Sequence, residues 1–191
     1  MSEKKVIFVL GGPGCGKGTQ AKAIAEQYGF GYAAAGDMLR AEAAKGDSPN
    51  AKRIAQIINN GELVPPPLIC ETIKKTIEES PYKFFLMDGF PRSIEQDDAF
   101  RQIVPPCDSV ALLDAPDEVL IARCLSRGET SNRADDNRKV IDRRIGIYKR
   151  ETVPVIERYR QEGKVFVVDA NQPIEKVRED FVAELKKHFE F

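Results

Sequence analysis

Cysteine is scarce in this sequence, and long apolar runs are missing from it. The four cysteines are far apart and form no C-x-x-C pair, so they indicate neither a zinc site nor a redox motif; they are Cys15, Cys70, Cys107 and Cys124. Reduced, buried thiols are expected. Residues 1–5 are polar and lead into only about six apolar positions, too few for a signal peptide or a membrane-spanning helix. We therefore expect a cytoplasmic protein without a membrane partner. Location in the nucleus is the alternative.

An excess of charge of either sign is missing as well. The chain has 29 Lys and Arg residues against 30 Asp and Glu residues, for a formal net charge of -1 at pH 7. A protein that coats nucleic acid or an anionic bilayer would be basic, so neither partner is expected. With 191 residues, of which 42% are hydrophobic and 31% charged, the chain is typical of a globular protein with one domain.

Short apolar runs alternate with longer stretches that have apolar residues at helical spacing. Four runs have the length and the composition of buried strands, at residues 6–10, 83–87, 109–113 and 165–168. Strands that alternate with helices form βαβ units, so the sequence predicts an α/β fold with a parallel sheet and helices on both faces. Ligands of such sheets bind at the carboxyl ends of the strands.

Two segments interrupt this alternation. Residues 32–64 contain two short amphipathic helices, without an obvious buried strand of their own. Residues 127–136 are polar throughout, which is typical of an exposed loop between helices. A long helical pattern then covers residues 137–161, with a kink or break expected at Pro154 because proline lacks a backbone donor. Residues 174–189 are expected to form a last helix against the sheet.

The segment after the first predicted strand, residues 11–19, has the sequence G-G-P-G-C-G-K-G-T. Its glycines allow backbone N–H groups to surround an anion, and a helix that begins near Gly16 directs its positive end to the same place. Lys17 adds a charge for terminal phosphates, and the Thr19 hydroxyl suits a position near bound Mg²⁺. The alternative is a glycine-rich turn without a ligand, which the strand, loop and helix context disfavours. The segment therefore predicts a phosphate-binding loop (P-loop).

This P-loop departs from the general formula G-x-x-x-x-G-K-[ST], because Gly18 follows the lysine and Thr19 comes one place later. The form resembles the nucleoside monophosphate kinases, a family that comprises adenylate kinases and UMP/CMP kinases. The resemblance extends over nearly the whole chain through further motifs in the family's order: A-G-D-M-L-R (35–40), N-G-E-L-V-P (60–65), D-G-F-P-R (88–92), R-G-E-T-S-N-R (127–133), D-D-N (135–137) and R-R (143–144).

The resemblance implies a three-layer P-loop fold with a parallel five-stranded sheet, as one kinase domain over residues 1–191. The core would comprise residues 1–31, 65–126 and 137–191, with a helical monophosphate-binding insertion at 32–64 and a short lid at 127–136. Longer adenylate kinases have a larger lid, sometimes with four zinc-binding cysteines, so no structural zinc is expected here. Because the family's short members are usually monomers, a monomer is expected.

Phosphoryl transfer between two nucleotides requires fixed positive charges and a metal rather than a covalent nucleophile, and arginine binds phosphate oxygens in pairs. The resemblance implies catalytic roles for Lys17, Asp88, Arg92, Arg127, Arg133 and Arg144. It implies ATP binding by Gly12, Pro13, Gly14, Cys15, Gly16, Lys17, Gly18, Thr19, Arg127 and Gln172. It implies binding of the monophosphate by Ala35, Gly36, Arg40, Glu62, Leu63, Val64, Gly89, Phe90, Pro91, Arg92, Gln96, Arg133 and Arg144. Mg²⁺ is the implied cofactor, held by Thr19 and Asp88 partly through water.

Three acidic residues also have a purely structural interpretation. Asp88 would act as a turn or helix cap, and Asp135 and Asp136 as caps of the helix that begins near Asn137. The resemblance associates the last two with the lid and its arginines, so both interpretations stay open for them.

The residues near the base favour different monophosphates. Ala35 stands where adenylate kinases usually have threonine and UMP/CMP kinases have alanine, and residues 55–65 also resemble the pyrimidine enzymes. Gln96 favours AMP, because adenylate kinases have at this place a glutamine that pairs with adenine. We expect transfer from Mg-ATP to UMP, CMP or dCMP; the alternative is an adenylate kinase that converts ATP and AMP to two ADP. A remote alternative is a switch or binding module that uses ATP without a small-molecule acceptor.

Overall fold

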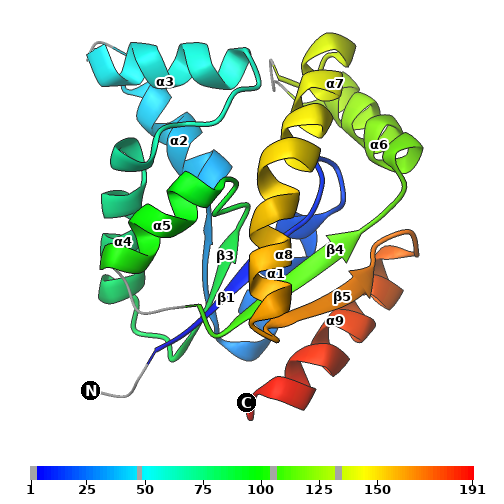
Figure 1. The fold of residues 1–191 in the computed structure, drawn as a ribbon. Helices are drawn as coiled ribbons and strands as arrows, with labels where there is room; N and C mark the ends of the chain where they lie inside the picture. The colour runs from blue at the N-terminus through cyan, green and yellow to red at the C-terminus, as the bar shows by residue number, and fades with distance from the viewer. Residues whose placement is uncertain (1–3, 47–48, 104–106, 132–134) are drawn as a thin grey trace.

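The computed structural model describes residues 4–46, 49–103, 107–131 and 135–191. Its centre is a sheet of parallel strands between two layers of helices (Figure 1). The strands are β1 (Lys5–Leu10), β2 (Gly31–Ala34), β3 (Phe84–Asp88), β4 (Ser109–Asp114) and β5 (Val165–Asp169), in the spatial order β2-β3-β1-β4-β5. The predicted α/β fold with a parallel sheet is therefore confirmed, as are the four strands that the sequence indicated.

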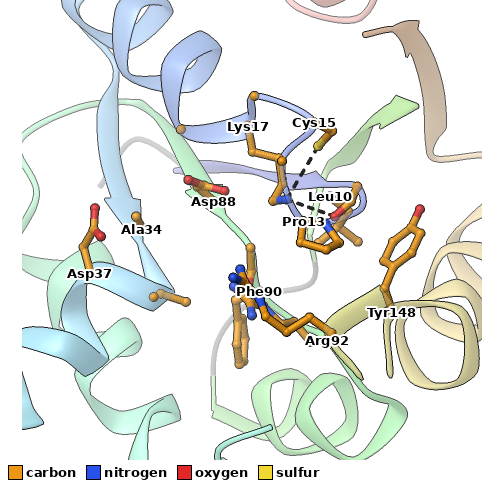
Figure 2. A pocket seen from close by; sticks show the side chains of 18 of the residues that line it. Leu10, Pro13, Cys15, Lys17, Ala34, Asp37, Asp88, Phe90, Arg92 and Tyr148 are labelled. Atoms are coloured by element: carbon orange, nitrogen blue, oxygen red, sulfur yellow. Dashed lines mark hydrogen bonds between the residues drawn. The ribbon is translucent and has the colours of Figure 1, made fainter. Parts of the chain in front are cut away.

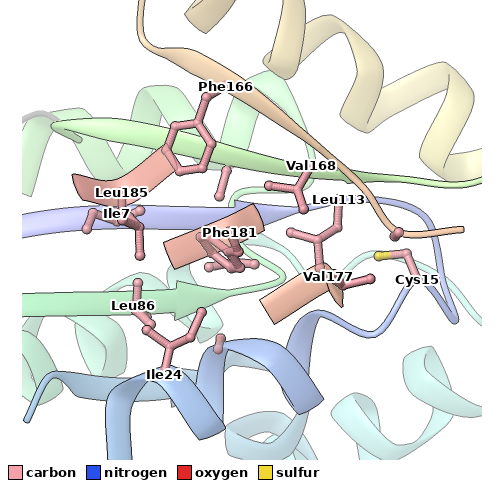
Figure 3. Close-up of a cluster of buried hydrophobic side chains, with 14 of the residues drawn as sticks. Ile7, Cys15, Ile24, Leu86, Leu113, Phe166, Val168, Val177, Phe181 and Leu185 are labelled. Carbon is pink, nitrogen blue, oxygen red and sulfur yellow. The ribbon is translucent and has the colours of Figure 1, made fainter. Parts of the chain in front are cut away.

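Each face of the sheet has its own apolar core, because successive residues of a strand point to opposite faces. One face is covered by α1 (Lys17–Tyr28), α6 (Asp117–Thr130), α7 (Arg138–Ile147) and α9 (Ile174–His188), the other by α4 (Cys70–Glu79), α5 (Ile94–Ile103) and α8 (Val153–Gln161). On β1, Ile7 and Val9 belong to the first core, shown in Figure 3, whereas Phe8 and Leu10 belong to the second. Burial on both faces explains why the strands appear in the sequence as continuous apolar runs.

The fifth strand that the resemblance implied is β2, which confirms the five-stranded sheet. The sequence pattern had not located this strand, because it indicated none in residues 32–64. Strand β2 pairs with β3 along its whole length, from Gly31 opposite Phe85 to Ala34 opposite Asp88. Its sequence G-Y-A-A lacks the β-branched residues that mark the other strands. A Cβ atom at Gly31 would lie 2.4 Å from Phe85 Cδ2, so the small residue is needed for the close approach of the two strands.

The rest of the insertion is helical, as expected. Helices α2 (Ala35–Ala44) and α3 (Pro49–Asn59) pack against each other, and η1 (Pro66–Leu68), a short 3₁₀ helix, precedes α4. Figure 1 shows α2 and α3 on one side of the carboxyl ends of the strands, with α6 and α7 on the other.

The polar segment 127–136 differs from the exposed loop that the sequence indicated. Helix α6 extends into this segment as far as Thr130, and Asp135 and Asp136 are buried. Residues 132–134 lie outside the described part of the chain, so the predicted site residue Arg133 is not placed. Asn137 is the N-cap of α7, and its side chain accepts a hydrogen bond from the Val140 N–H. The cap role considered for the two aspartates therefore belongs to Asn137.

The expected break in the long helix near Pro154 is confirmed. Between α7 and α8 lies one π-helical turn, η2 (Tyr148–Thr152), and Pro154 stands in the first turn of α8. Proline cannot donate to the preceding turn and its ring crowds the carbonyl group four residues earlier, so the irregular turn comes just before it. No helix among the described residues is long and apolar enough to cross a membrane.

Candidate functional site

A cavity of about 710 Å³ opens at the carboxyl ends of the strands, between the insertion and helices α6 and α7. Most of the predicted site residues line it: Pro13, Gly14, Cys15, Gly16, Lys17, Gly18, Thr19, Ala35, Gly36, Arg40, Glu62, Leu63, Val64, Asp88, Gly89, Phe90, Arg92, Gln96, Arg127, Arg144 and Gln172. Gly12 and Pro91 are not among the lining residues, and Arg133 lies outside the described residues. The fold thus brings together motifs that are far apart in the sequence.

Close contacts explain why two positions of the P-loop are occupied by glycine. A Cβ atom at Gly11 would lie 2.3 Å from the carbonyl oxygen of Leu113, and one at Gly14 would lie 2.6 Å from that of Leu120. Gly14 also has a φ of +85°, in the left-handed region that side chains disfavour. The loop therefore packs against β4 and α6 at distances that only glycine permits.

Lys17 is the first residue of α1 and its side chain turns back over the P-loop. Its ammonium group donates hydrogen bonds to the carbonyl oxygens of Gly11 and Gly12, both at 2.9 Å. Figure 2 shows it beside the Cys15 thiol, 3.6 Å from Sγ. The positive charge of Lys17 and the positive end of α1 therefore lie at one place, where a phosphate would be bound.

Asp88 ends β3 inside the cavity and is 9% exposed. The Tyr32 hydroxyl donates a hydrogen bond of 3.2 Å to its Oδ2 atom. Burial raises the pKa of the Asp88 carboxyl group, whereas the charges of Lys17 and Arg92 act to lower it. A Cβ atom at Gly18 would lie 3.2 Å from the same Oδ2 atom. Glycine after the P-loop lysine therefore leaves room for this carboxylate, which a side chain at position 18 would crowd.

Three hydrogen bonds hold Arg92 in the cavity. Its Nε atom donates to the carbonyl oxygen of Gly89 at 2.7 Å, and its backbone N–H donates to Gln96 Oε1 at 2.8 Å. Its carbonyl oxygen accepts from Thr152 Oγ1 at 2.8 Å, so the π turn η2 is connected directly to this arginine. Burial, followed by repulsion from Arg144, lowers the pKa of Arg92 to about 10. Arg92 therefore keeps its charge at neutral pH.

Asp136 connects the arginines of α6 and α7. Arg127 donates to both of its carboxylate oxygens, from Nε at 2.6 Å and from Nη2 at 2.7 Å, and Arg144 Nη1 lies 3.2 Å from Oδ1. The same Arg144 atom forms an ion pair with Asp135, 2.8 Å from its Oδ2 atom. The hydrogen bonds that Arg127 donates to Asp136 raise the pKa of Arg127. The two aspartates thus orient the arginines, which is the second of the two interpretations that the sequence left open.

The insertion contributes one arginine and one contact with α7. Arg40 pairs with Asp37 one turn earlier in α2, with 2.8 Å between Nη2 and Oδ1. Glu62, in the turn after α3, accepts a hydrogen bond of 2.6 Å from Arg143 of α7. A Cβ atom at Gly61 would lie 2.8 Å from Val140 Cγ1, so the turn lies directly against α7. The insertion and α7 therefore meet at one edge of the cavity.

A mostly apolar part of the cavity lies between the insertion and α5. Its lining includes Leu39, Ile58, Val64 and Ile69, together with the buried methyl group of Ala35. The Gln96 amide is oriented there: Nε2 donates to the carbonyl oxygen of Val64 at 2.7 Å, and Oε1 accepts from the Arg92 N–H. Apolar walls with one oriented amide suit the flat ring of a base.

Several lining residues were not predicted from the sequence, and Arg123 and Tyr32 are among them. Arg123 lies one helical turn before Arg127 in α6 and donates to the carbonyl oxygen of Ala170 at 2.9 Å; this four-residue spacing was the available signal. Tyr32 lies on β2, the strand that the sequence pattern did not locate. Gln172 also lines the cavity. Its Nε2 atom donates to the carbonyl oxygen of Asp169 at 3.0 Å and to Asp180 Oδ2 at 3.2 Å.

Two oxygen donors, one at the end of β3 and one in the first turn of α1, fit a magnesium ion. Asp88 supplies a carboxylate and Thr19 a hydroxyl group, and both line the cavity next to Lys17. Mg²⁺ prefers oxygen ligands and usually keeps several waters and binds substrate phosphates rather than a full protein cage. No cluster of three or more His, Cys, Asp or Glu side chains able to hold a metal occurs within the described ranges.

Comparison with known proteins matches the chain to one family. The family model described as adenylate kinase matches residues 9–164. The chain is 40% identical over 189 residues to "Adenylate kinase 1" of Schistosoma mansoni, which covers 98% of this chain and 95% of that protein. It is 36% identical over 189 residues to "Adenylate kinase isoenzyme 1" of Gallus gallus, covering 98% and 97%. It is also 39% identical over 191 residues to "UMP-CMP kinase" of Danio rerio, covering 96% and 97%.

Proposed function

Since the chain belongs to the adenylate kinase family, we propose that it transfers the γ-phosphoryl group of Mg-ATP reversibly to a nucleoside 5′-monophosphate, with UMP, CMP and dCMP as preferred acceptors. The products are ADP and the nucleoside diphosphate. The observation that carries this proposal is the set of cationic side chains around one cavity: Lys17, Arg40, Arg92, Arg127 and Arg144. Two polyanions placed end to end need such an arrangement.

The charges divide between the two nucleotides. Lys17 and Arg127 would bind the donor phosphates above the P-loop, and Arg40, Arg92 and Arg144 the acceptor phosphate. An oxygen of the acceptor phosphate attacks the γ-phosphorus, and the bond from that phosphorus to the β–γ bridging oxygen breaks, so the protein needs no nucleophile. Its contribution is to position the two nucleotides, to stabilise the shifting negative charge and to exclude water.

Thr19 and Asp88 would hold Mg²⁺, partly through water, and the ion when bound neutralises phosphate charge during transfer. Asp136 orients Arg127 and Arg144, and arginines held in this way lose less entropy when they contact phosphates. The short lid at 127–136 would close over the donor.

Ala35 supports a pyrimidine acceptor. Its side chain is 3% exposed and lines the base region with a methyl group, which offers adenine no hydrogen bond. The second candidate function, adenylate kinase, is favoured by Gln96, whose oriented amide presents a donor and an acceptor to a base. The remote alternative of an ATP-dependent switch has no use for Arg40 and Arg92 in the same cavity.

The test is ADP formation from Mg-ATP by the purified protein, without an acceptor and with AMP, UMP, CMP or dCMP. We expect turnover only with an acceptor, and a kcat/KM for UMP and CMP at least about 10-fold above that for AMP. A higher value for AMP would establish the alternative acceptor. Turnover that no acceptor stimulates would contradict the kinase and support the switch.

A variant of Ala35 tests whether this residue sets the preference between pyrimidine monophosphates and AMP. Ala35→Thr adds a hydroxyl group in the base region and should shift kcat/KM towards AMP. Ala44→Thr, at the exposed end of the same helix, is the matched control and should leave the preference unchanged. We further propose that the enzyme acts as a cytoplasmic monomer, to be tested by light scattering and by localisation of the tagged chain.

A further inference from the structure

We propose that Tyr32 is a positioning residue of this site: its hydroxyl group orients the Asp88 carboxylate for phosphoryl transfer. The inference rests on the proposed kinase function and adds to it a residue on β2. The observation behind it is the 3.2 Å hydrogen bond from Tyr32 Oη to Asp88 Oδ2.

The register of the sheet explains why a tyrosine reaches this carboxylate. Ala34 lies opposite Asp88 in the pairing of β2 with β3, and Tyr32 lies two residues before Ala34 on the same face of β2. Two residues of a strand span about 6.6 Å. A serine or threonine hydroxyl at position 32 would stop short of Asp88, whereas the phenol ring carries its hydroxyl to the end of the strand.

Helix α1 leaves space for this contact. A Cβ atom at Gly18 would lie 3.2 Å from Asp88 Oδ2 and 3.5 Å from the Tyr32 hydroxyl. The hydroxyl, the carboxylate and the first turn of α1 therefore meet at one point, next to the Lys17 side chain that lines the same cavity. Figure 2 shows Asp88 directed from the end of its strand towards the side of the cavity where Lys17 lies.

This geometry gives Tyr32 an indirect role. A carboxylate on a two-bond side chain can rotate, and a donated hydrogen bond to one oxygen restricts it and leaves the other oxygen directed at the ligand. Tyr32 then acts through Asp88 and contacts no reacting atom. Loss of the hydroxyl should lower the rate of phosphoryl transfer and the gain in ATP affinity that Mg²⁺ provides. Nucleotide binding without the metal should change little.

The experiment compares Tyr32→Phe, Asp88→Asn and the double variant with the wild type. Phenylalanine keeps the ring and removes only the hydroxyl. We expect Tyr32→Phe to lower kcat about 5- to 50-fold, while KM for the acceptor changes less than about twofold. The double variant should have the kcat of Asp88→Asn alone, because the hydroxyl then has no carboxylate to orient. Tyr28→Phe, which removes a hydroxyl at the far end of α1, should keep wild-type kcat.

A binding measurement provides a readout independent of turnover. Calorimetric titration of wild type and Tyr32→Phe with ATP, with and without Mg²⁺, should give equal affinities without the metal and a smaller gain from the metal in the variant. Wild-type kcat in Tyr32→Phe, an equal further loss in the Asp88→Asn background, or a raised KM at constant kcat would each overturn the inference. Failure of the kinase proposal is distinguishable, because the wild type would then show no acceptor-dependent ADP formation.

Discussion

Arg127 of α6 donates to both carboxylate oxygens of Asp136, at 2.6 and 2.7 Å, in the paired geometry that guanidinium and carboxylate groups favour. The Asp136 side chain is fully buried in this contact, whereas Arg127 stays one-third exposed at the cavity. The carboxylate therefore fixes the direction of the arginine and leaves part of the guanidinium available to a phosphate.

Replacement of Asp136 should damage the site more than the fold. In Asp136→Asn an amide faces Arg127 and Arg144, the charge is lost, and one hydrogen bond becomes a contact between two donors. We expect kcat to fall about 10-fold or more, and the free energy of unfolding to fall by about 1–3 kcal/mol. Kinetics with Mg-ATP and urea unfolding measure the two effects.

Asp142→Asn is the matched control for that variant, because Asp142 pairs with Arg138 on the exposed side of α7. Exposed ion pairs contribute little, so both kcat and stability should stay close to wild type. An Asp136→Asn enzyme with wild-type kcat would show that the arginines need no orientation.

Lys17→Met should remove transfer without unfolding the protein. The methionine keeps most of the apolar stem and loses the charge that the proposed transition state requires. We expect kcat to fall by about 100-fold or more, with the free energy of unfolding changed by less than about 1 kcal/mol. Lys75→Met, at an exposed position of α4, serves as the control. Near-normal turnover in Lys17→Met would contradict the proposed mechanism.

Two glycines should respond to alanine with opposite signs. In Gly14→Ala the new methyl group meets the Leu120 carbonyl oxygen at 2.6 Å and the backbone has a φ of +85°, so we expect a loss of about 2 kcal/mol or more. Gly146 lies inside α7 and a Cβ there meets nothing within 4 Å, so Gly146→Ala should stabilise by about 0.5–1 kcal/mol. Thermal and urea unfolding measure both; equal effects would argue against the packing described for the P-loop.

Tyr159 should make the protein sensitive to alkaline pH. It is completely buried, and its hydroxyl donates to Asp97 Oδ1 at 2.5 Å. Burial raises the pKa of Tyr159 above its ordinary value of 10.0, so the folded state holds this proton more tightly than the unfolded state. Its contribution to stability is complete below pH 10 and is lost as the pH rises above that value.

The variant Tyr159→Phe tests whether this hydroxyl group causes the loss of stability at alkaline pH. The variant leaves the buried Asp97 carboxylate without one donor, so it should be about 1–3 kcal/mol less stable at pH 7. Its stability should then fall less steeply than that of the wild type between pH 10 and pH 11, as measured by urea unfolding at each pH. Burial also raises the pKa of Tyr148, to about 12. Tyr148 therefore contributes part of the pH dependence of stability in both proteins. Parallel curves would show that Tyr159 does not titrate on unfolding.

Local patterns were sufficient for much of the fold. The strands buried on both faces, the insertion helices and the P-loop are each encoded within a few consecutive residues, by apolar runs, helical spacing and glycines. Strand β2 was missed because its residues have little strand preference of their own and pair only because β3 lies beside them. The polar segment after Arg127 was taken for an exposed loop because sequence polarity does not distinguish solvated charges from paired, buried ones.

The sequence by itself determined that two phosphate-bearing ligands are expected, since it contains a P-loop together with arginines in family motifs. Only the tertiary structure decided which side chains work together: Asp136 with Arg127 and Arg144, Thr152 with Arg92, and Tyr32 with Asp88. The physical reason is distance along the chain. Backbone preferences and hydrophobic periodicity act over a few residues, whereas these pairs are 8 to 60 residues apart. Asp136 meets Arg127 and Arg144 because α6 and α7 pack against each other, and Tyr32 meets Asp88 because β2 pairs with β3.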